Sequence, residues 1–261
     1  MANTVFANEV IGSKIKDILT TSVDLKNFMT IDATLAEAPG MKKKVNTYVA
    51  TGEVEDLAMG AGNSKEIEAG FTSKDYDVLT TQGKFQYFDE QAMTDPNIVD
   101  VGVEGLTKTI TNDFTKKAIA EFGKATLTLD ASATGLTFDA VVDAIAKLGV
   151  EDEKGYFLLI NVADKAAVRK ALGDDLKYVE DFARTGYIGS VCGVPVIVSK
   201  AVPAKTAFLA NNEAVTLFIK KGSEIEQERD ANVRNNKVFA RKVALVALTD
   251  ATKVVKITTA K

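Results

Sequence analysis

The longest regular pattern of apolar positions lies between Thr94 and Ala125. Apolar residues recur there at spacings of three and four, at Val99, Val103, Leu106, Ile110, Phe114, Ala118 and Phe122. This spacing predicts one face of an amphipathic helix. Asp95 suits its N-cap, and Pro96 suits the first turn, where a missing N–H has no consequence. At a rise of 1.5 Å per residue the helix would be about 40 Å long, so other elements must lie along it.

Residues 40–87 show the alternation of extended chain. Two arms of about 14 residues flank a turn-forming run that contains Gly60 and Gly62, which indicates a long β-hairpin. The run does not match a phosphate-binding loop, because Lys65 stands where a dinucleotide fingerprint needs glycine and no helix pattern follows. We interpret it as a flexible hairpin tip. The apolar content is too thin to bury the hairpin within its own subunit, so a second copy is expected to cover it.

After the long helix, residues 127–221 have the pattern of an α/β unit. A helix over residues 138–148 is expected, capped by Thr137 and ended by Gly149. The apolar run of residues 156–160 predicts a strand buried on both faces. A second helix should begin near Asp164, and residues 189–198 should form one strand with a glycine bend.

Strand patterns return from Val215 to the C-terminus. These strands, including residues 254–257, are expected to form a meander laid along the long helix. At the other end of the chain, residues 8–20 have helical spacing. We interpret residues 1–38 as an arm rather than as part of a core.

Composition narrows the function. Apolar residues make up 46% of the 261 residues, enough for a core. There is no histidine, and Cys192 is the only cysteine, which excludes Ser-His-Asp and Cys-His catalysis, ordinary zinc sites and an internal disulfide. The 32 basic and 36 acidic residues are interspersed, which argues against a broad nucleic-acid-binding surface. No apolar run is long enough to span a membrane. Neither catalysis nor a cofactor is expected.

Glu224, Glu226 and Glu228 alternate along one predicted strand, so their carboxylates share a face and repel one another. A divalent-cation site and a catalytic acid pair are both weak interpretations, because no ligand loop and no pKa-raising neighbour are visible. The carboxylates could pair with Arg241 and Lys242, with the lysines of residues 42–44 from a neighbouring copy, or simply face solvent.

The order of these elements resembles the major capsid protein of tailed bacteriophages, the HK97-type coat fold. The C-terminal stretch LFIKKGSEIEQERDANVRNNKVFARKVALVALTDATKVVKI carries most of the likeness, and GSVCGVPVIVSKAVPAKTAFLANNEA precedes it as in that family. The resemblance implies an α+β subunit with four parts. These are an N-terminal arm (1–38), an extended loop (39–90), a peripheral domain of spine helix and β-meander (91–126 and 217–261) and an inserted α/β axial domain (127–216).

The same resemblance implies a structural, non-enzymatic protein that assembles into pentamers and hexamers of an icosahedral phage head around double-stranded DNA, contacted non-specifically. Other partners would be a separate scaffolding protein, a portal and a decoration protein, and the protein would belong to the virion after assembly in the host cytoplasm. A Lys–Asn crosslink, known in this family, cannot be assigned to particular residues. The candidates for inter-subunit contact are Lys42, Lys43, Lys44, Gly60, Gly62, Glu224, Glu226, Glu228, Arg241 and Lys242.

Two alternatives stay open at this point. An encapsulin-like nanocompartment shell protein would use the same fold to house an enzyme. An α/β enzyme or binding domain centred on residues 127–221 would leave the hairpin and the long helix without a purpose.

Overall fold

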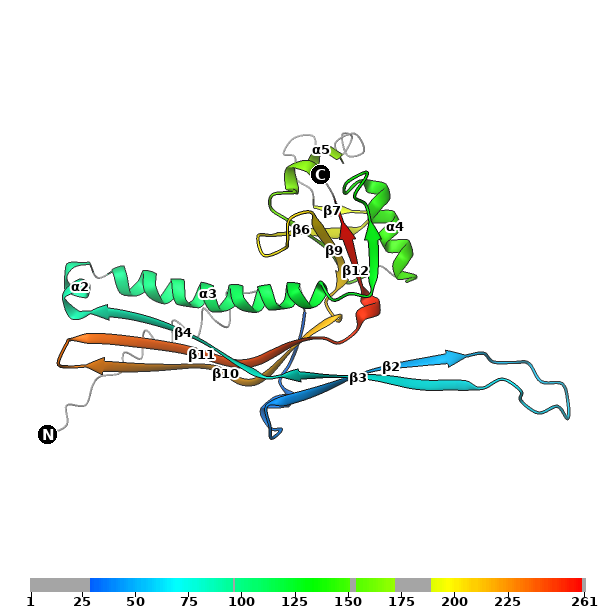
Figure 1. Cartoon of the computed structure of the whole chain (residues 1–261), viewed down its shortest axis with the longest axis horizontal. Helices are drawn as coiled ribbons and strands as arrows, with labels where there is room; N and C mark the ends of the chain where they lie inside the picture. The colour runs from blue at the N-terminus through cyan, green and yellow to red at the C-terminus, as the bar shows by residue number, and fades with distance from the viewer. Residues whose placement is uncertain (1–28, 96, 151–153, 172–188, 260–261) are drawn as a thin grey trace.

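The computed structural model describes residues 29–95, 97–150, 154–171 and 189–259. The expected helix over residues 8–20 and most of the arm therefore lie outside the described residues. The fold is a mixed α+β arrangement of three sheets and a few helices. Figure 1 shows a long helix lying along one sheet, a second sheet with its helices at one end of that helix, and a hairpin projecting in the opposite direction from the first sheet.

The long helix is α3 (Asn97–Phe122), and the short helix α2 (Asp89–Thr94) precedes it. The Asp95 carboxylate accepts a hydrogen bond of 3.0 Å from the Asn97 N–H, so Asp95 caps the helix as predicted. The apolar face of α3 is buried from Val103 to Phe122. The predicted spine helix is confirmed, with fewer residues at each end than its pattern suggested.

A four-stranded sheet lies against α3 in the order β1-β10-β11-β4. Its strands are β1 (Thr30–Asp32), β10 (Val215–Asp230), β11 (Asn235–Leu248) and β4 (Leu79–Phe88). A 3₁₀ turn, η2 (Thr34–Ala36), follows β1. Strand β4 pairs antiparallel with β11, although the sequence placed residues 79–88 in the extended loop. The meander thus includes a strand that comes before the helix in the chain.

Two glycines allow α3 to lie close to β4. A Cβ atom at Gly102 of α3 would lie 2.1 Å from the ring of Phe85, and one at Gly83 of β4 would lie 2.3 Å from Leu106 Cδ1. Both distances are far inside van der Waals contact, so only glycine fits at either position without movement. Each element therefore supplies one glycine to the contact.

The second sheet has the order β5-β12-β9-β6-β8-β7. Its strands are β5 (Leu127–Asp130), β12 (Val254–Thr258), β9 (Thr206–Asn211), β6 (Tyr156–Asn161), β8 (Val194–Ser199) and β7 (Ser190–Val191). Helices α4 (Phe138–Leu148) and α5 (Lys165–Ala171) accompany it. Thr137 accepts a hydrogen bond from the Ala140 N–H, and Gly149 has the left-handed φ of 62°, so both predicted ends of α4 are confirmed.

Two sequence expectations are wrong in this sheet. Strand β12 pairs with β5 and β9 and does not belong to the meander. Residues 189–198 form a tight β7–β8 hairpin rather than one bent strand, with Cys192 and Gly193 in its turn at φ 52° and 79°. Cys192 is partly buried and packs against the core of this sheet.

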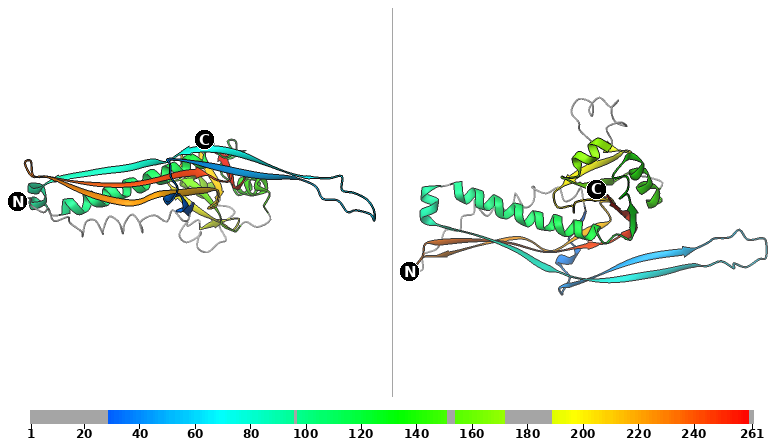
Figure 2. Two further views of the ribbon diagram at one scale, coloured as in Figure 1. Left: turned by 90° about the horizontal axis from the view of Figure 1, so that it is seen from below. Right: turned by 45° about the horizontal axis from the view of Figure 1, so that its top comes forward.

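The hairpin consists of β2 (Lys42–Gly52) and β3 (Ile67–Asp77), paired antiparallel over their full length. Strand β3 continues through Val78 directly into β4, and the Val78 N–H donates a 2.8 Å hydrogen bond to the Met41 carbonyl. Residues 67–88 are thus one extended run that belongs to two sheets. Figure 2 shows from two further sides that the hairpin points away from the rest of the chain.

Candidate assembly surfaces

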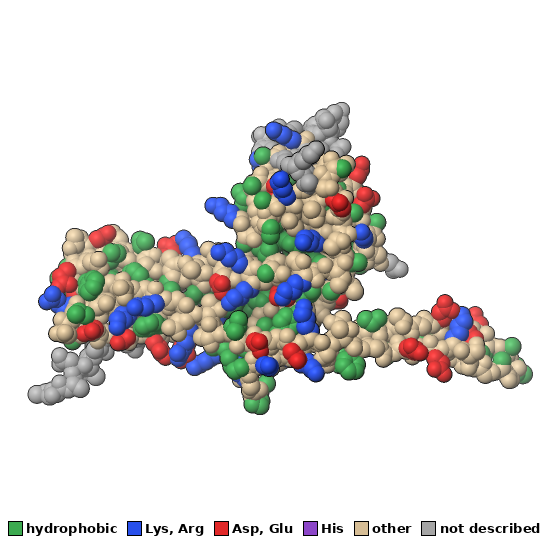
Figure 3. Space-filling model, in the orientation of Figure 1, with side chains coloured by type: hydrophobic (Ala, Val, Ile, Leu, Met, Phe, Trp, Pro, Cys, Tyr) green, Lys and Arg blue, Asp and Glu red, His purple; other side chains and the backbone are tan. Residues whose placement is uncertain are grey.

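The paired strands β2 and β3 form a two-stranded ribbon, called the blade of the hairpin below. The blade exposes several apolar side chains. Tyr48 and Phe71 lie opposite each other in the register, with ring centroids 6.1 Å apart, and are 72% and 67% exposed. Ile67, near the tip, is 63% exposed. In the space-filling view the hairpin projects as a thin extension beyond the body of the molecule (Figure 3). Nothing in the described part of the chain covers these exposed side chains, and a two-stranded ribbon has little stability of its own in water.

At the tip of the hairpin, residues 53–66, one carboxylate accepts several hydrogen bonds, and Glu53 forms an ion pair with Lys65. Glu55 accepts hydrogen bonds from the Ser64 N–H, from Ser64 Oγ at 2.9 Å and from the Lys65 N–H at 3.0 Å. These bonds, that from the Ser64 backbone first, lower the pKa of Glu55. Gly60 adopts φ 87° at the turn, as a glycine there permits. The tip therefore has a defined internal hydrogen-bond network, which the interpretation as a flexible loop did not include.

At the base of the hairpin, the expected lysines find partners in their own subunit. Lys42 Nζ lies 4.0 Å from the Asp77 carboxylate, a long and exposed pair. Lys43 Nζ lies 5.0 Å from the centroid of the Phe218 ring, within cation–π range. Lys44 is exposed and sits opposite Asp75 in the register.

Glu224, Glu226 and Glu228 do share one face of β10, as predicted, and each has a cationic partner on β11. Arg241 donates to Glu224 and to Glu226, both at 2.7 Å. Lys237 lies 3.5 Å from Glu228. The hydrogen bond from Arg241, followed by one from Lys221, lowers the pKa of Glu224 to about 2. The carboxylates are thus paired inside the subunit, and a guanidinium occupies the position between the two closest ones.

Lys242 is not a partner of these glutamates. Its Nζ lies 5.5 Å from the centroid of the Phe114 ring of α3, and burial lowers its pKa. Arg241 and Lys242 are adjacent on a strand and so point to opposite faces, which the alternation alone could have shown. The same rule places Lys237 on the same face as Arg241. Sequence analysis did not name Lys237 as the partner of Glu228, although the alternation along the strand predicts it.

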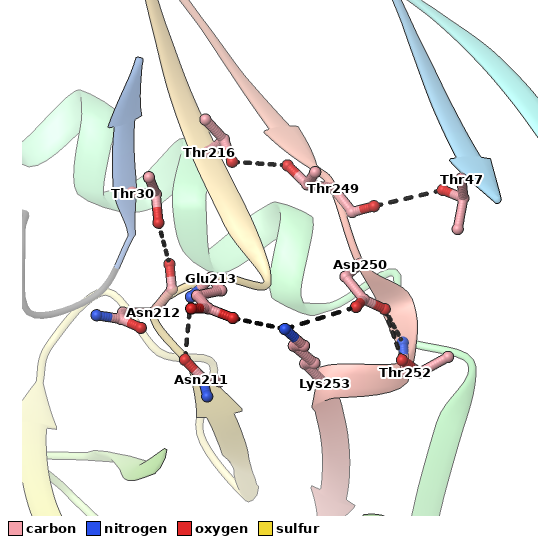
Figure 4. Close-up of polar contacts among 10 residues, drawn as sticks. All are labelled: Thr30, Thr47, Asn211, Asn212, Glu213, Thr216, Thr249, Asp250, Thr252 and Lys253. Carbon is pink, nitrogen blue, oxygen red and sulfur yellow. Dashed lines mark hydrogen bonds and ion pairs between the residues drawn. The ribbon is translucent and has the colours of Figure 1, made fainter. Parts of the chain in front are cut away.

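The two sheets and the hairpin meet at a polar corner (Figure 4). The corner is formed by the β9–β10 connection, the β11–β12 connection and one residue of β2. The Ala214 carbonyl accepts from the N–H groups of Thr249 and Asp250 at 2.8 and 3.1 Å. Thr249 Oγ1 donates to Thr216 Oγ1 at 2.7 Å, and the Thr249 carbonyl accepts from Thr47 Oγ1 at 3.3 Å. Thr249 thus connects the hairpin with both sheets.

An ion pair reinforces the same corner. Lys253, in η3 (Ala251–Lys253), lies 2.5 Å from Glu213 and 4.0 Å from Asp250. The hydrogen bond to Glu213 raises the pKa of Lys253. Asp250 caps the turn by accepting from the Thr252 N–H at 3.0 Å. Sequence analysis missed this corner; the Asp-x-Thr spacing before a strand was its only local signal.

The long helix on a sheet, the side sheet and the projecting hairpin together define a shell-subunit architecture, and comparison with known proteins agrees. The family model described as phage capsid protein matches residues 72–257. The chain belongs to this phage capsid family. The expected resemblance to tailed-phage major capsid proteins is therefore confirmed.

Comparison with individual proteins supports the family assignment. The chain is 25% identical to the major capsid protein of Staphylococcus phage phiMR11, over 96% of this chain and 92% of that protein. The capsid of Ralstonia phage GP4 matches with a TM-score of 0.71 at 9% identity, covering 89% of this chain and 87% of that one. A virus-like particle from Pyrococcus furiosus matches with a TM-score of 0.65 at 12% identity, covering 97% and 100%.

The fold alone is thus shared by phage capsids and by the Pyrococcus particle, whereas the family model and the curated relative are both of phages. The chain has the structural role of a phage capsid protein rather than that of an encapsulin, and it self-assembles into a capsid shell of the virion. No helix within the described ranges is long and apolar enough to cross a membrane.

Proposed function

We propose that this protein builds an icosahedral phage head from pentamers and hexamers, and that the hairpin of each copy lies over a neighbouring copy. The observation that carries the proposal is the exposed apolar blade around Tyr48 and Phe71, which the described part of its own subunit leaves open. Large exposed rings on a thin ribbon are typical of a surface that another chain covers.

The parts of the subunit receive their roles from this proposal. Residues 39–90 contain the extended loop, α3 and the four-stranded sheet form the peripheral domain, and the six-stranded sheet with its helices forms the axial domain around five- and six-fold positions. Residues 1–38 were expected to form an arm outside the core, but this is wrong for the residues from Met29 on, because Met29 and Leu35 are buried and β1 pairs with β10. These residues therefore go with the peripheral domain, and the proposed arm is limited to residues 1–28. Because β12 pairs with β5 and β9, residues 254–258 belong with the axial domain in this proposal. The sequence pattern had assigned them to the peripheral domain.

The remaining partners follow the same logic. The protein acts as a structural component, without catalysis or cofactor, in keeping with its membership of the phage capsid family. Packaged double-stranded DNA is contacted non-specifically; on the face seen in Figure 3, cationic and anionic side chains are interspersed. A separate scaffolding protein, a portal and a decoration protein complete the head, and assembly takes place in the cytoplasm of the bacterial host.

Expression of the full chain, alone and with a candidate scaffold, tests the proposal by electron microscopy and sedimentation. We expect closed shells, and hydrogen exchange that is fast in the hairpin of unassembled chain and slow in the shell. Deleting residues 60–64 should leave a folded subunit that closes few shells, because the tip has no core contacts. A well-folded monomer at all concentrations, with a protected hairpin, would contradict the proposal.

A further inference from the structure

The direction in which the hairpin leaves the body is set at its base, because the blade has so few contacts of its own. Tyr76 is the one buried residue of β3, and Val45 is the one buried residue of β2. Both belong to a small separate core. Its members are Leu35, Val45, Tyr76, Val78, Phe218, Leu245 and Ala247. This small core, called the anchor below, attaches the base of the hairpin, together with the hydrogen bond from Thr47 Oγ1 to the Thr249 carbonyl.

Within that anchor, Tyr76 is the residue that also reaches the long helix. Lys124 Nζ, just beyond the end of α3, lies 5.8 Å from the centroid of the Tyr76 ring, and Lys74 Nζ lies 5.3 Å from it. Lys124 also forms an ion pair with Glu121, which is only 8% exposed. A ring with two ammonium groups within about 6 Å of its centroid is attracted to both by its quadrupole. Tyr76 therefore connects the hairpin, the sheet core and the helix end.

The polar atoms at this point are not fully satisfied. Tyr76 Oη and Glu121 Oε2 are both buried without a hydrogen-bond partner in the described structure. Burial raises the pKa of Tyr76, and the nearby Glu121 charge adds to this, so the hydroxyl stays protonated. The ring makes the contacts with both ammonium groups, whereas the hydroxyl lies near the Glu121 carboxylate and the Leu248 backbone.

A small rotation at this anchor becomes a large displacement at the tip. From Tyr76 to the end of β3 at Ile67 the strand spans ~30 Å at 3.3 Å per residue, so a rotation of ~10° would move that end by ~5 Å. In a shell built from repeated copies, the angle between neighbours decides whether and at what size the assembly closes. A displacement of this size exceeds the tolerance of a packed contact.

We propose that Tyr76 is a positioning residue for assembly: through its ring contacts with Lys124 and the small core, it aims the hairpin and so sets shell curvature. This inference rests on the proposed function and deepens it. Residues on the blade, such as Tyr48, supply contact area, whereas Tyr76 supplies direction. Loss of contact area should lower the yield of shells, whereas loss of direction should change their diameter.

The test compares matched substitutions in the full-length chain under conditions in which the wild type forms shells. Tyr76→Leu keeps an apolar side chain in the core but removes the ring, and Tyr76→Phe keeps the ring. Tyr48→Leu makes the same change on the exposed blade. Shell yield is measured by sedimentation, diameter by electron microscopy, and folding of α3 and β11 by hydrogen exchange.

We expect Tyr76→Leu to fold and to form shells whose mean diameter shifts or whose distribution broadens at least twofold. Tyr76→Phe should keep the wild-type diameter, and Tyr48→Leu should lower the yield at unchanged diameter. If Tyr76→Leu does not fold, Lys124→Met, which leaves the small core intact, should change the diameter in the same way. Wild-type diameters in the folded Tyr76 or Lys124 variant would overturn the inference. A wild-type chain without shells would instead overturn the proposed function.

Discussion

The hairpin and the four-stranded sheet differ in what covers them, although one extended run passes through both. Residues 67–77 form β3, of which only Tyr76 is buried, whereas residues 79–88 form β4 beneath α3. In β4 the alternate residues Phe85 and Tyr87 are partly buried and pack against the core that includes α3. Strand pairing alone therefore leaves apolar side chains exposed, and a covering element decides whether they belong to a core or to an assembly surface.

The largest expected contrast comes from replacing a phenylalanine in each region. Phe122 of α3 is fully buried and packs edge-on against Phe157 at 6.0 Å, whereas Phe71 of the blade is 67% exposed. Phe122→Ala should lower the free energy of unfolding by about 3–5 kcal/mol. Phe71→Ala should leave the unfolding of the subunit nearly unchanged but reduce shell yield. Denaturant unfolding of unassembled chain and sedimentation measure the two effects, and equal destabilisation would erase the contrast.

A smaller effect is expected from the close approach of helix and sheet. Gly102→Ala would drive a methyl group into the Phe85 ring, which should destabilise the subunit by about 1–3 kcal/mol despite better helix propensity. The matched control is Gly105→Ala on the same helix, where nothing lies within 4 Å of the new Cβ. That change should stabilise the subunit by up to about 1 kcal/mol. Thermal unfolding checks both, and the same sign for the two variants would refute the close contact.

Reversing one charge among the paired carboxylates Glu224, Glu226 and Glu228 should have a modest effect when the residue changed is Glu226, because its side chain is 56% exposed. Glu226→Lys places a second cation beside Arg241, which now lies 2.7 Å from Glu226. We expect a small decrease in the melting temperature of unassembled chain, partly restored by salt as the repulsion is screened. Glu226→Gln, which removes charge without reversing it, should have less effect. Failure of shells with a normal melting temperature would show that this charge acts between subunits.

The smallest expected effect is the acid response of Glu224. Because its pKa falls to about 2 in the folded chain, from an ordinary 4.5, the folded state binds this proton less readily than the unfolded state. The stabilisation is therefore complete above pH 4.5 and is lost as the pH falls from there through about 2. Denaturant unfolding gives the free energy of unfolding of wild type and of Glu224→Gln at each pH. The two values should converge as the pH falls through this window. A difference that persists below pH 2 would show that the Glu224 charge is not its cause.

The sequence predicted the elements with regular apolar spacing. The faces of α3 and α4, the caps at Asp95 and Thr137, and the buried strand β6 all follow from local periodicity and capping chemistry. The order of these elements was then enough to indicate the capsid fold. Local pattern sufficed here because each element carries its own signal.

Sequence patterns did not show which sheet a short strand joins. Strand β12 has the same apolar run whether it pairs with β11 or with β9, and its place depends on the corner at Asp250 and Lys253. Likewise, nothing local distinguishes Gly83 and Gly102, which are required by close contacts, from Gly105, which is not. Such features depend on residues distant in the chain, and a single sequence does not reveal them.

The pairing of β4 with β11 also has a consequence for synthesis of the chain. Asp89 and Asn236, which hydrogen bond at the far end of these strands, are 147 positions apart, and every strand of the six-stranded sheet except β12 is inserted between them. Such distant pairing forms slowly and late, after the intervening loop has closed. The anchor of the hairpin includes Phe218, Leu245 and Ala247, so the core at its base is complete only after these residues have been synthesised. The strands of the hairpin are therefore synthesised well before the residues that fix their base.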